Sequence, residues 1–201
     1  MAAAIDFYFD FTSPYGYLAS TRINALAAKY GRSVNWYPVL LGAVFKATGG
    51  QPLVAIPLKG PYSAHDILRT ARFHQIELRF PEPFPVGTQH AARAFLVVQS
   101  EQGADAAQAF AQKLFQAYFV ANRNIGELEQ VLQVAAECGL DAVALAARVA
   151  EPAIKEALKV QTDGAMAKGV FGSPYVIVDG EPFWGFDRFD QLEAFLRDGR
   201  I

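Results

Sequence analysis

The clearest hydrophobic pattern lies at the start of the chain, where residues 5–11 read IDFYFDF. Apolar side chains occupy every second position. Because successive side chains of a strand point to opposite faces, this alternation predicts a β-strand with a strongly apolar face. The strand ends at Thr12-Ser13, and Pro14 begins a segment of helical spacing that runs to about Tyr30. Proline suits the first turn of a helix, because the N–H group that it lacks has no partner there.

The next segments complete a β-α-β pattern and then become irregular. Residues 33–41, SVNWYPVLL, predict a second strand with Pro38 near its end. A helix between two strands favours a parallel β-α-β unit. The glycines and prolines of residues 42–61 predict irregular structure. A helix is expected over residues 63–74, and the three prolines of residues 77–85 predict a loop.

The middle of the chain has helical spacing almost throughout, interrupted by single glycines that typically end helices. We expect five helices, the first capped by Thr88, over residues 88–102, 104–122, 127–138, 141–149 and 151–168. The end returns to strand patterns: YVIVD, an Asp-Gly hairpin turn and EPFWG precede a final helix beginning at Asp187. This order predicts an α/β domain that is split by a helical insertion.

Composition narrows the classes of function. The 201 residues carry a net charge of −2 without a block of basic residues, which argues against nucleic acid and anionic membranes as partners. The N-terminal MAAAIDF lacks the features of a signal peptide, and no stretch is long and uncharged enough to span a bilayer. Cys138 is the single cysteine, expected to be buried in an amphipathic helix. With no intrachain disulfide, a cytoplasmic location is expected.

Three positions are candidates for chemistry on the residues alone. Ser13 lies between a buried strand and a helix start, where the common interpretation is an N-cap, and where unpaired N–H groups also favour an anion. A hydrolase nucleophile is disfavoured because the G-x-S-x-G pattern is absent, and the three histidines have neither triad nor metal spacing. Asp187 fits an N-cap of the last helix. Arg188 then lies in a first turn, which the helix dipole disfavours, so it is expected to have an anionic partner.

Together these stretches resemble a known family. The chain has FDFTSPY at 9–15, LGAVFKATG at 41–49, GVFGSP at 169–174 and DGEPFWGFDR at 179–188. Between them stand the matching PY, Asp66 and Arg69. In this order they resemble the 2-hydroxychromene-2-carboxylate isomerases, which belong with the kappa-class glutathione transferases and the DsbA-like thiol oxidoreductases. The resemblance covers essentially the whole chain.

The resemblance implies a thioredoxin-like domain interrupted by an all-helical insertion. We expect residues 1–41 and 169–201 to form the glutathione-binding thioredoxin-like domain, and 42–168 the helical insertion with its connecting loops. Related oxidoreductases have Cys-Pro-x-Cys where this chain has Ser13-Pro14-Tyr15-Gly16. Both sulfur positions are lost, which excludes thiol–disulfide exchange by this motif. A hydroxyl donor at a helix start would still favour a thiolate, which in this family belongs to glutathione.

Four further residues are assigned to glutathione by the resemblance. Pro174 matches a cis-proline, and Val170 matches the position whose backbone pairs with the glutathione peptide. Asp187 and Arg188 match the pair that holds the γ-glutamyl end, which carries both an amine and a carboxylate. The resemblance also allows a homodimer, since dimers are common in the kappa group.

The resemblance further implies a reaction and a substrate site. The family isomerises 2-hydroxychromene-2-carboxylate to trans-o-hydroxybenzylidenepyruvate in naphthalene-type catabolism, with the glutathione thiolate adding and leaving so that a double bond can rotate. Lys46 matches a basic residue near the substrate carboxylate. Phe84 and Trp184 are candidates for the aromatic pocket, although such residues are more often core. Two alternatives stay open: a kappa-like transferase that conjugates electrophiles, and a non-catalytic thioredoxin-like binding module.

Overall fold

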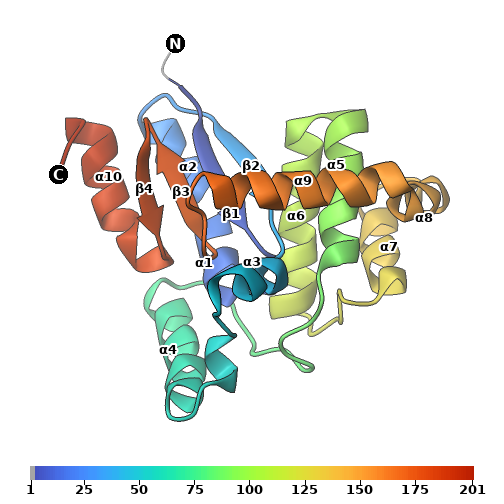
Figure 1. Ribbon diagram of the computed structural model, residues 1–201, viewed down its shortest axis with the longest axis horizontal. Helices are drawn as coiled ribbons and strands as arrows, with labels where there is room; N and C mark the ends of the chain where they lie inside the picture. The colour runs from blue at the N-terminus through green and yellow to red at the C-terminus, as the bar shows by residue number, and fades with distance from the viewer. Residues whose placement is uncertain (1–2) are drawn as a thin grey trace.

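The computed structural model describes residues 3–201 (Figure 1). Its sheet has four strands in the order β2-β1-β3-β4. The strands are β1 (Ile5–Phe9), β2 (Val34–Pro38), β3 (Tyr175–Val178) and β4 (Glu181–Trp184). β1 pairs in parallel with β2 and antiparallel with β3, and β4 pairs antiparallel with β3. The predicted β-α-β unit, the terminal hairpin and the α/β class are therefore confirmed.

Helices cover both faces of this sheet (Figure 1). The first crossover consists of α1 (Pro14–Ser20) and α2 (Ile23–Lys29), and the final helix is α10 (Phe189–Asp198). α2 and α10 lie on the same face, since the side chains of Lys29 and Tyr30 both contact Glu193. The opposite face packs under α3 (Leu41–Thr48) and α9 (Pro152–Ala167), where Tyr8, Val39 and Ala165 form a small apolar cluster. Strand β1 is therefore buried on both sides.

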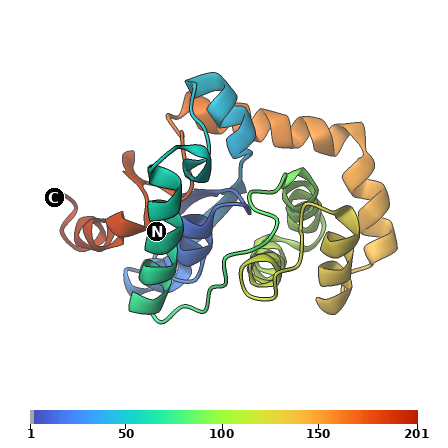
Figure 2. The same cartoon turned by 90° about the horizontal axis from the view of Figure 1, so that it is seen from below.

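A helical block lies beside the β2 edge of the sheet (Figures 1 and 2). It contains α5 (Gln89–Gln102), α6 (Ala104–Phe119), α7 (Leu128–Glu137) and α8 (Ala142–Ala150), while α4 (Lys59–Phe73) lies apart from it, next to α1. The long helix α9 joins the block to the sheet, because it packs on α5 and α8 as well as on β2. The fold is thus thioredoxin-like with helical insertion. The expected boundaries at residues 41 and 169 stay a prediction.

Aromatic side chains join the sheet to the helical block. Phe9 of β1 lies with its ring centroid 5.3 Å from Trp36, 5.7 Å from Phe95 of α5 and 5.7 Å from Phe115 of α6. All four side chains are essentially inaccessible to solvent. Since an aromatic side chain buries a large apolar area, this cluster fixes the strand that leads into Ser13. The alternation in residues 5–11 therefore identified the centre of the core.

Several local predictions were wrong. The helix expected from Pro14 to Tyr30 is two helices, separated at Thr21-Arg22. The segment predicted as irregular contains α3 and a short 3-10 helix, η1 (Leu53–Ala55). Cys138 is exposed rather than buried.

Of two predicted caps, one was wrong and the other was right in position only. Asp187 does not cap the last helix, because it lies in the 3-10 helix η2 (Phe186–Arg188), and Arg188 occupies the cap position of α10. Thr88 occupies the predicted N-cap position of α5, but its side chain makes no capping hydrogen bond, since its hydroxyl donates to the carboxylate of Asp10.

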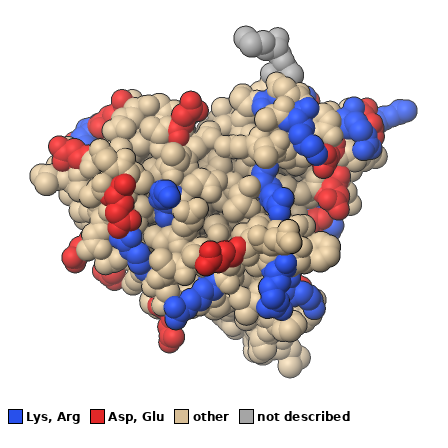
Figure 3. All heavy atoms as spheres, turned by 180° about the vertical axis from the view of Figure 1, so that it is seen from behind, with Lys and Arg blue, Asp and Glu red and all other residues tan. Residues whose placement is uncertain are grey.

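The surface is mixed in charge. Figure 3 shows acidic and basic side chains interspersed over one face of the molecule, which agrees with the small net charge of −2. Within residues 3–201 no helix has the length and apolar character needed to cross a membrane.

Candidate functional site at the Ser13 turn

Ser13 joins the start of α1 to a segment near the end of the chain. Its backbone is extended, and its Oγ accepts a hydrogen bond from the N–H of Gly16 at 3.0 Å, so it is an N-cap. The same hydroxyl donates to the carbonyl of Ser173 at 2.8 Å, and the residue is only 6% exposed. The predicted cap is confirmed, and it is also a contact between residues 160 positions apart.

Gly16 permits this close approach. A Cβ atom at Gly16 would lie 2.7 Å from Oγ of Ser173 and 3.1 Å from Cβ of Ser13. Any larger residue would force Ser173, Ser13 or α1 itself to shift. The peptide bond between Ser173 and Pro174 is cis, as the resemblance implies, and the Pro174 carbonyl accepts from the N–H of Gly185 at 3.0 Å. Two chain segments therefore meet at Ser13: the α1 start and the cis-proline loop.

Val170 lies just before this loop, and its side chain is buried. Its N–H donates to the carbonyl of Ala165 at 3.0 Å, at the end of α9. That donor is therefore already paired within the chain. A ligand strand that pairs with the backbone of Val170 in this conformation would therefore have to donate to the Val170 carbonyl.

Asp187 and Arg188 form a charged pair next to α1. They lie in η2, which packs against α1, and their side chains are 73% and 48% exposed. The guanidinium of Arg188 lies 3.4 Å from the carboxylate of Asp187, so Arg188 has an anionic partner in the residue directly before it. Because both groups face solvent, both charges remain accessible to an external ligand.

A polar cluster beside Ser13 was not predicted from the sequence. The hydroxyl of Tyr15 donates to the carboxylate of Asp66 in α4 at 2.6 Å, and Asp66 also pairs with Arg69. Arg69 in turn donates to the hydroxyl of Tyr62 at 3.1 Å. Burial first, and then Asp66, raises the pKa of Tyr15, whereas the Tyr15 hydrogen bond is the main cause that lowers the pKa of Asp66. The sequence identified Asp66 and Arg69 only as residues that match the family, because no sequence pattern predicts a contact between α4 and α1.

The three predicted substrate residues lie on different segments. Lys46 is exposed in the last turn of α3 and forms no ion pair within the described chain. Phe84 is half-buried in the proline-rich loop, which is tied to the Ser13 turn because the N–H of Val86 donates to Oγ1 of Thr12 at 3.2 Å. Trp184 is 55% exposed on β4 and lies against Phe171, with ring centroids 4.8 Å apart. Trp184 is therefore not a core residue.

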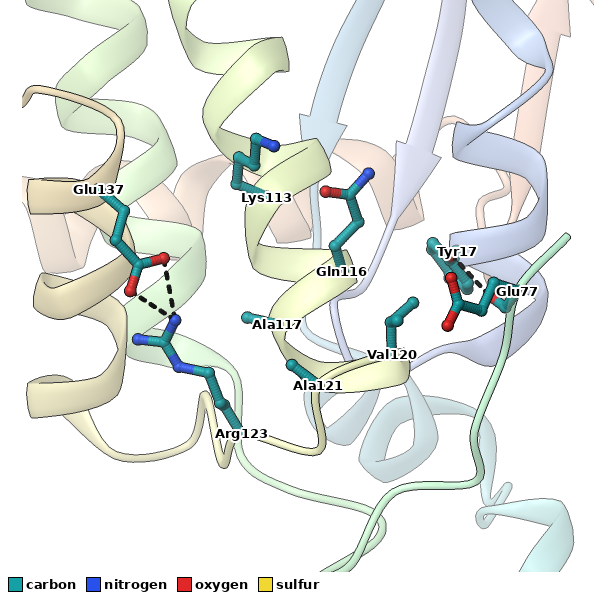
Figure 4. A pocket seen from close by; sticks show the side chains of 9 residues that line it. All are labelled: Tyr17, Glu77, Lys113, Gln116, Ala117, Val120, Ala121, Arg123 and Glu137. Carbon is teal, nitrogen blue, oxygen red and sulfur yellow. Dashed lines mark hydrogen bonds and ion pairs between the residues drawn. The ribbon is translucent and has the colours of Figure 1, made fainter.

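One cavity lies away from these residues. Its volume is about 500 Å³, and it lies between α1, α6 and α7 (Figure 4). Arg123 and Glu137 form an ion pair at its wall, at 2.8 Å, and Tyr17 donates to the backbone carbonyl of Glu77. The remaining lining residues are Lys113, Gln116, Ala117, Val120 and Ala121. None of the predicted site residues lines this cavity, and residues 3–201 contain no cluster of metal-binding side chains.

Comparisons with known proteins agree with this architecture. The family model of the DSBA-like thioredoxin domain matches residues 4–197. A 2-hydroxychromene-2-carboxylate isomerase of Sphingobium xenophagum is 31% identical over 200 residues, which cover 98% of this chain and 100% of that protein. The chain belongs to the 2-hydroxychromene-2-carboxylate isomerase family.

The isomerase family is also represented among solved structures. A structure of 2-hydroxychromene-2-carboxylate isomerase is 30% identical and superposes with a TM-score of 0.86, covering 96% of this chain and 94% of that one. Glutathione S-transferase kappa 1 of Homo sapiens is 28% identical, with coverage of 96% and 90%. The relatives are thus isomerases and glutathione transferases, and the resemblance indicated by the motifs is confirmed.

The site of this isomerase-family chain can stabilise an anion but does not activate its own serine. Within residues 3–201, the side chain of Ser13 is hydrogen-bonded only to the Gly16 N–H and the Ser173 carbonyl. Neither group removes a proton, so Ser13 is not prepared as a nucleophile. Its hydroxyl donates instead to a neutral carbonyl group.

Proposed function

We propose that the protein is a glutathione-dependent isomerase that converts 2-hydroxychromene-2-carboxylate to trans-o-hydroxybenzylidenepyruvate. The observation that carries this proposal is the docking of Ser13 on the cis-proline loop, with no cysteine at either sulfur position of the turn. Such a turn keeps a polar donor for an external thiolate and has no thiol of its own. The similarity to the Sphingobium isomerase over 98% of the chain supports this reading.

The residues around Ser13 suit glutathione. The tripeptide presents a thiol, two peptide groups and a zwitterionic γ-glutamyl end. Ser13 offers a hydroxyl, the Val170–Pro174 segment offers backbone groups, and Asp187 and Arg188 offer adjacent opposite charges that face solvent. A zwitterion fits that pair, because its amine would bind the aspartate and its carboxylate the arginine.

Glutathione, when bound, supplies the thiolate nucleophile that makes rotation about a carbon–carbon double bond possible. The chain's contribution is to favour the charged form of the thiol. The Ser13 proton is donated to the neutral carbonyl of Ser173, and a hydrogen bond to an anion is stronger than one to a neutral acceptor. Redirecting the proton to a thiolate therefore stabilises the thiolate and lowers the thiol pKa.

The aromatic carboxylate requires a cation and an apolar surface. Lys46 is exposed and free of ion pairs within the described chain, so its ammonium group can bind the substrate carboxylate. Phe84 lies in the loop tied to Thr12 and packs against Phe80, while Trp184 lies on β4 against Phe171 and opposite Tyr175, which follows the cis-proline. We assign Lys46 to the carboxylate and the two aromatic residues to the ring.

A kappa-like transferase is the second candidate, favoured by the 28% identity to Glutathione S-transferase kappa 1. Product analysis with substrate in large excess over glutathione separates the two functions. An isomerase returns its thiol, so all of the substrate is converted and free glutathione is recovered. A transferase stops when the glutathione is consumed. A non-catalytic binding module, unlike both enzymes, is not retained on immobilised glutathione and converts nothing.

Replacing Arg188 by alanine is expected to weaken glutathione binding about tenfold, since one charge-assisted hydrogen bond is lost. The dissociation constant from calorimetric titration checks this. Arg197→Ala is the matched control, because Arg197 is also exposed and also pairs with a neighbouring aspartate, but lies at the end of α10. Equal affinity in wild type and Arg188→Ala would remove Arg188 from the proposed site.

A further inference from the structure

A buried carboxyl group lies directly before the Ser13 turn. Asp10 follows β1 and is 3% exposed. Its Oδ1 accepts from the N–H of Thr12 at 3.0 Å and from the hydroxyl of Thr88 at 2.5 Å. Its Oδ2 accepts from the N–H of Leu41 at 2.7 Å. Both carboxyl oxygens therefore serve as acceptors.

The backbone of Asp10 adds two more contacts. Its N–H donates to Oγ of Ser173 at 2.9 Å, and its carbonyl accepts from the N–H of Ser13 at 2.9 Å. One residue is thus hydrogen-bonded to the Ser13 turn, to the cis-proline loop, to the start of α3 and to the residue before α5. These segments are separated by up to 163 positions in the sequence.

No cation neutralises this carboxyl group. Within residues 3–201, no lysine, arginine or histidine nitrogen lies within 4.0 Å of it. Burial raises the pKa of Asp10, and the three hydrogen bonds from Thr12, Thr88 and Leu41 oppose that shift. A buried carboxyl group that depends on so few donors is costly when one of them is lost. The positions of the three donors around the Asp10 carboxyl group are therefore tightly constrained.

We propose that Asp10 is a positioning residue that holds α3, and with it Lys46, in register with Ser13. The inference rests on the proposed function, in which Lys46 binds the substrate carboxylate. Leu41 is the first residue of α3, and Lys46 follows five residues later in the same helix, about 7.5 Å along its axis. Because a helix moves as a rigid element, a shift of its first turn displaces Lys46 as well.

The hydrogen bonds of the Asp10 carboxylate can be weakened by substituting either Asp10 itself or Thr88. Asp10→Asn leaves one acceptor oxygen, so either the Leu41 N–H or the Thr12 N–H must face an NH₂ group. Thr88→Val removes the hydroxyl and keeps the side-chain shape, whereas Thr88→Ser restores the hydroxyl. Asp6→Asn is the matched control, since Asp6 is an aspartate of β1 whose carboxylate accepts from Tyr8 and Asn35 on the sheet surface.

Two measurements on the full-length chain test the proposal. Amide hydrogen exchange is expected to become about tenfold faster at Leu41 in Asp10→Asn, with a smaller increase in Thr88→Val, because a bond to a charged acceptor is lost or weakened. In kinetics, Asp10→Asn is expected to raise the KM for the aromatic carboxylate about tenfold. Glutathione affinity should change less than about twofold, since the backbone bonds from Asp10 to Ser13 and Ser173 remain.

Each outcome decides the proposal. Thr88→Ser and Asp6→Asn should behave as wild type in both measurements. Unchanged exchange at Leu41 in Asp10→Asn would overturn the positioning role whether or not the protein is an isomerase. Faster exchange with an unaltered KM, or equal effects of Thr88→Val and Thr88→Ser, would also overturn it. If the wild type converts no substrate, the proposed function fails, and the exchange at Leu41 alone shows whether Asp10 holds α3.

Discussion

Ser13→Ala is expected to lower turnover about 100-fold, the effect of removing one donor that stabilises a developing or bound anion. The thiol of bound glutathione should then have a higher pKa, because a hydrogen bond to its charged form is lost. The rising limb of the pH–rate profile should therefore move to higher pH. Folding should persist, with a loss of about 1 kcal/mol for the missing N-cap. Steady-state kinetics across pH measure the turnover and the pH–rate profile, and thermal unfolding measures the loss of stability.

Ser20→Ala is the control for this experiment. Ser20 belongs to the same helix, is 2% exposed and donates its hydroxyl to the carbonyl of Tyr17 at 2.7 Å. It should lose similar stability without a change in the pH–rate profile. If Ser13→Ala kept wild-type turnover and an unshifted profile, Ser13 would be a cap and nothing more.

Gly16→Ala is expected to impair the site by steric means. The added Cβ would lie 2.7 Å from Oγ of Ser173, so either this hydroxyl must move and lose its hydrogen bond from the Asp10 N–H, or α1 and the cis-proline loop must separate. Overpacking of this kind costs about 1–3 kcal/mol. Because the shift falls on Ser13 and Ser173 themselves, both glutathione affinity and turnover should fall. Calorimetric titration and thermal unfolding measure the two effects.

Gly164→Ala provides the opposite case. Gly164 lies within α9, and a Cβ atom there would meet no atom within 4 Å. Replacing a helical glycine by alanine stabilises by about 0.5–1 kcal/mol, so this variant should unfold at a higher temperature and keep full activity. A Gly16→Ala protein as stable and as active as Gly164→Ala would show that the close packing at Gly16 is not needed.

The parts of the fold predicted from sequence are those with strong local periodicity. The IDFYFDF alternation predicted β1, and the Asp-Gly turn predicted the β3–β4 hairpin. Single glycines correctly marked the ends of most helices in the middle of the chain. Gly103 and Gly139, for example, have φ angles of 90° and 78°, a region that glycine enters at little cost.

The parts missed depend on contacts between distant residues. Helix α3 begins where the Leu41 N–H finds the carboxylate of Asp10, 31 residues earlier, while the nearby glycines and prolines suggested a loop. The break between α1 and α2 has neither glycine nor proline to announce it. Threonine is a residue type typical of N-caps, but the hydroxyl of Thr88 donates to the carboxylate of Asp10 and makes no capping hydrogen bond. No local sequence pattern indicates hydrogen bonds between residues so far apart in the chain.

The candidate site was predicted in the same uneven way. Motif resemblance pointed to Ser13, to the cis bond before Pro174 and to the adjacent Asp187 and Arg188, whose ligand roles stay predictions. Tyr15 was missed because its partner, Asp66, is 51 residues away. Asp10 was noticed only as an alternating strand residue, since its burial and its donors become visible only in three dimensions.

The most direct test is isomerisation of 2-hydroxychromene-2-carboxylate, followed by absorbance, with glutathione absent and then present at one-hundredth of the substrate concentration. We expect no enzymatic conversion without glutathione. With this catalytic amount we expect complete conversion to trans-o-hydroxybenzylidenepyruvate and recovery of the free thiol. Conversion that is equally fast without glutathione, or that stops at one turnover per glutathione, would contradict the proposed function.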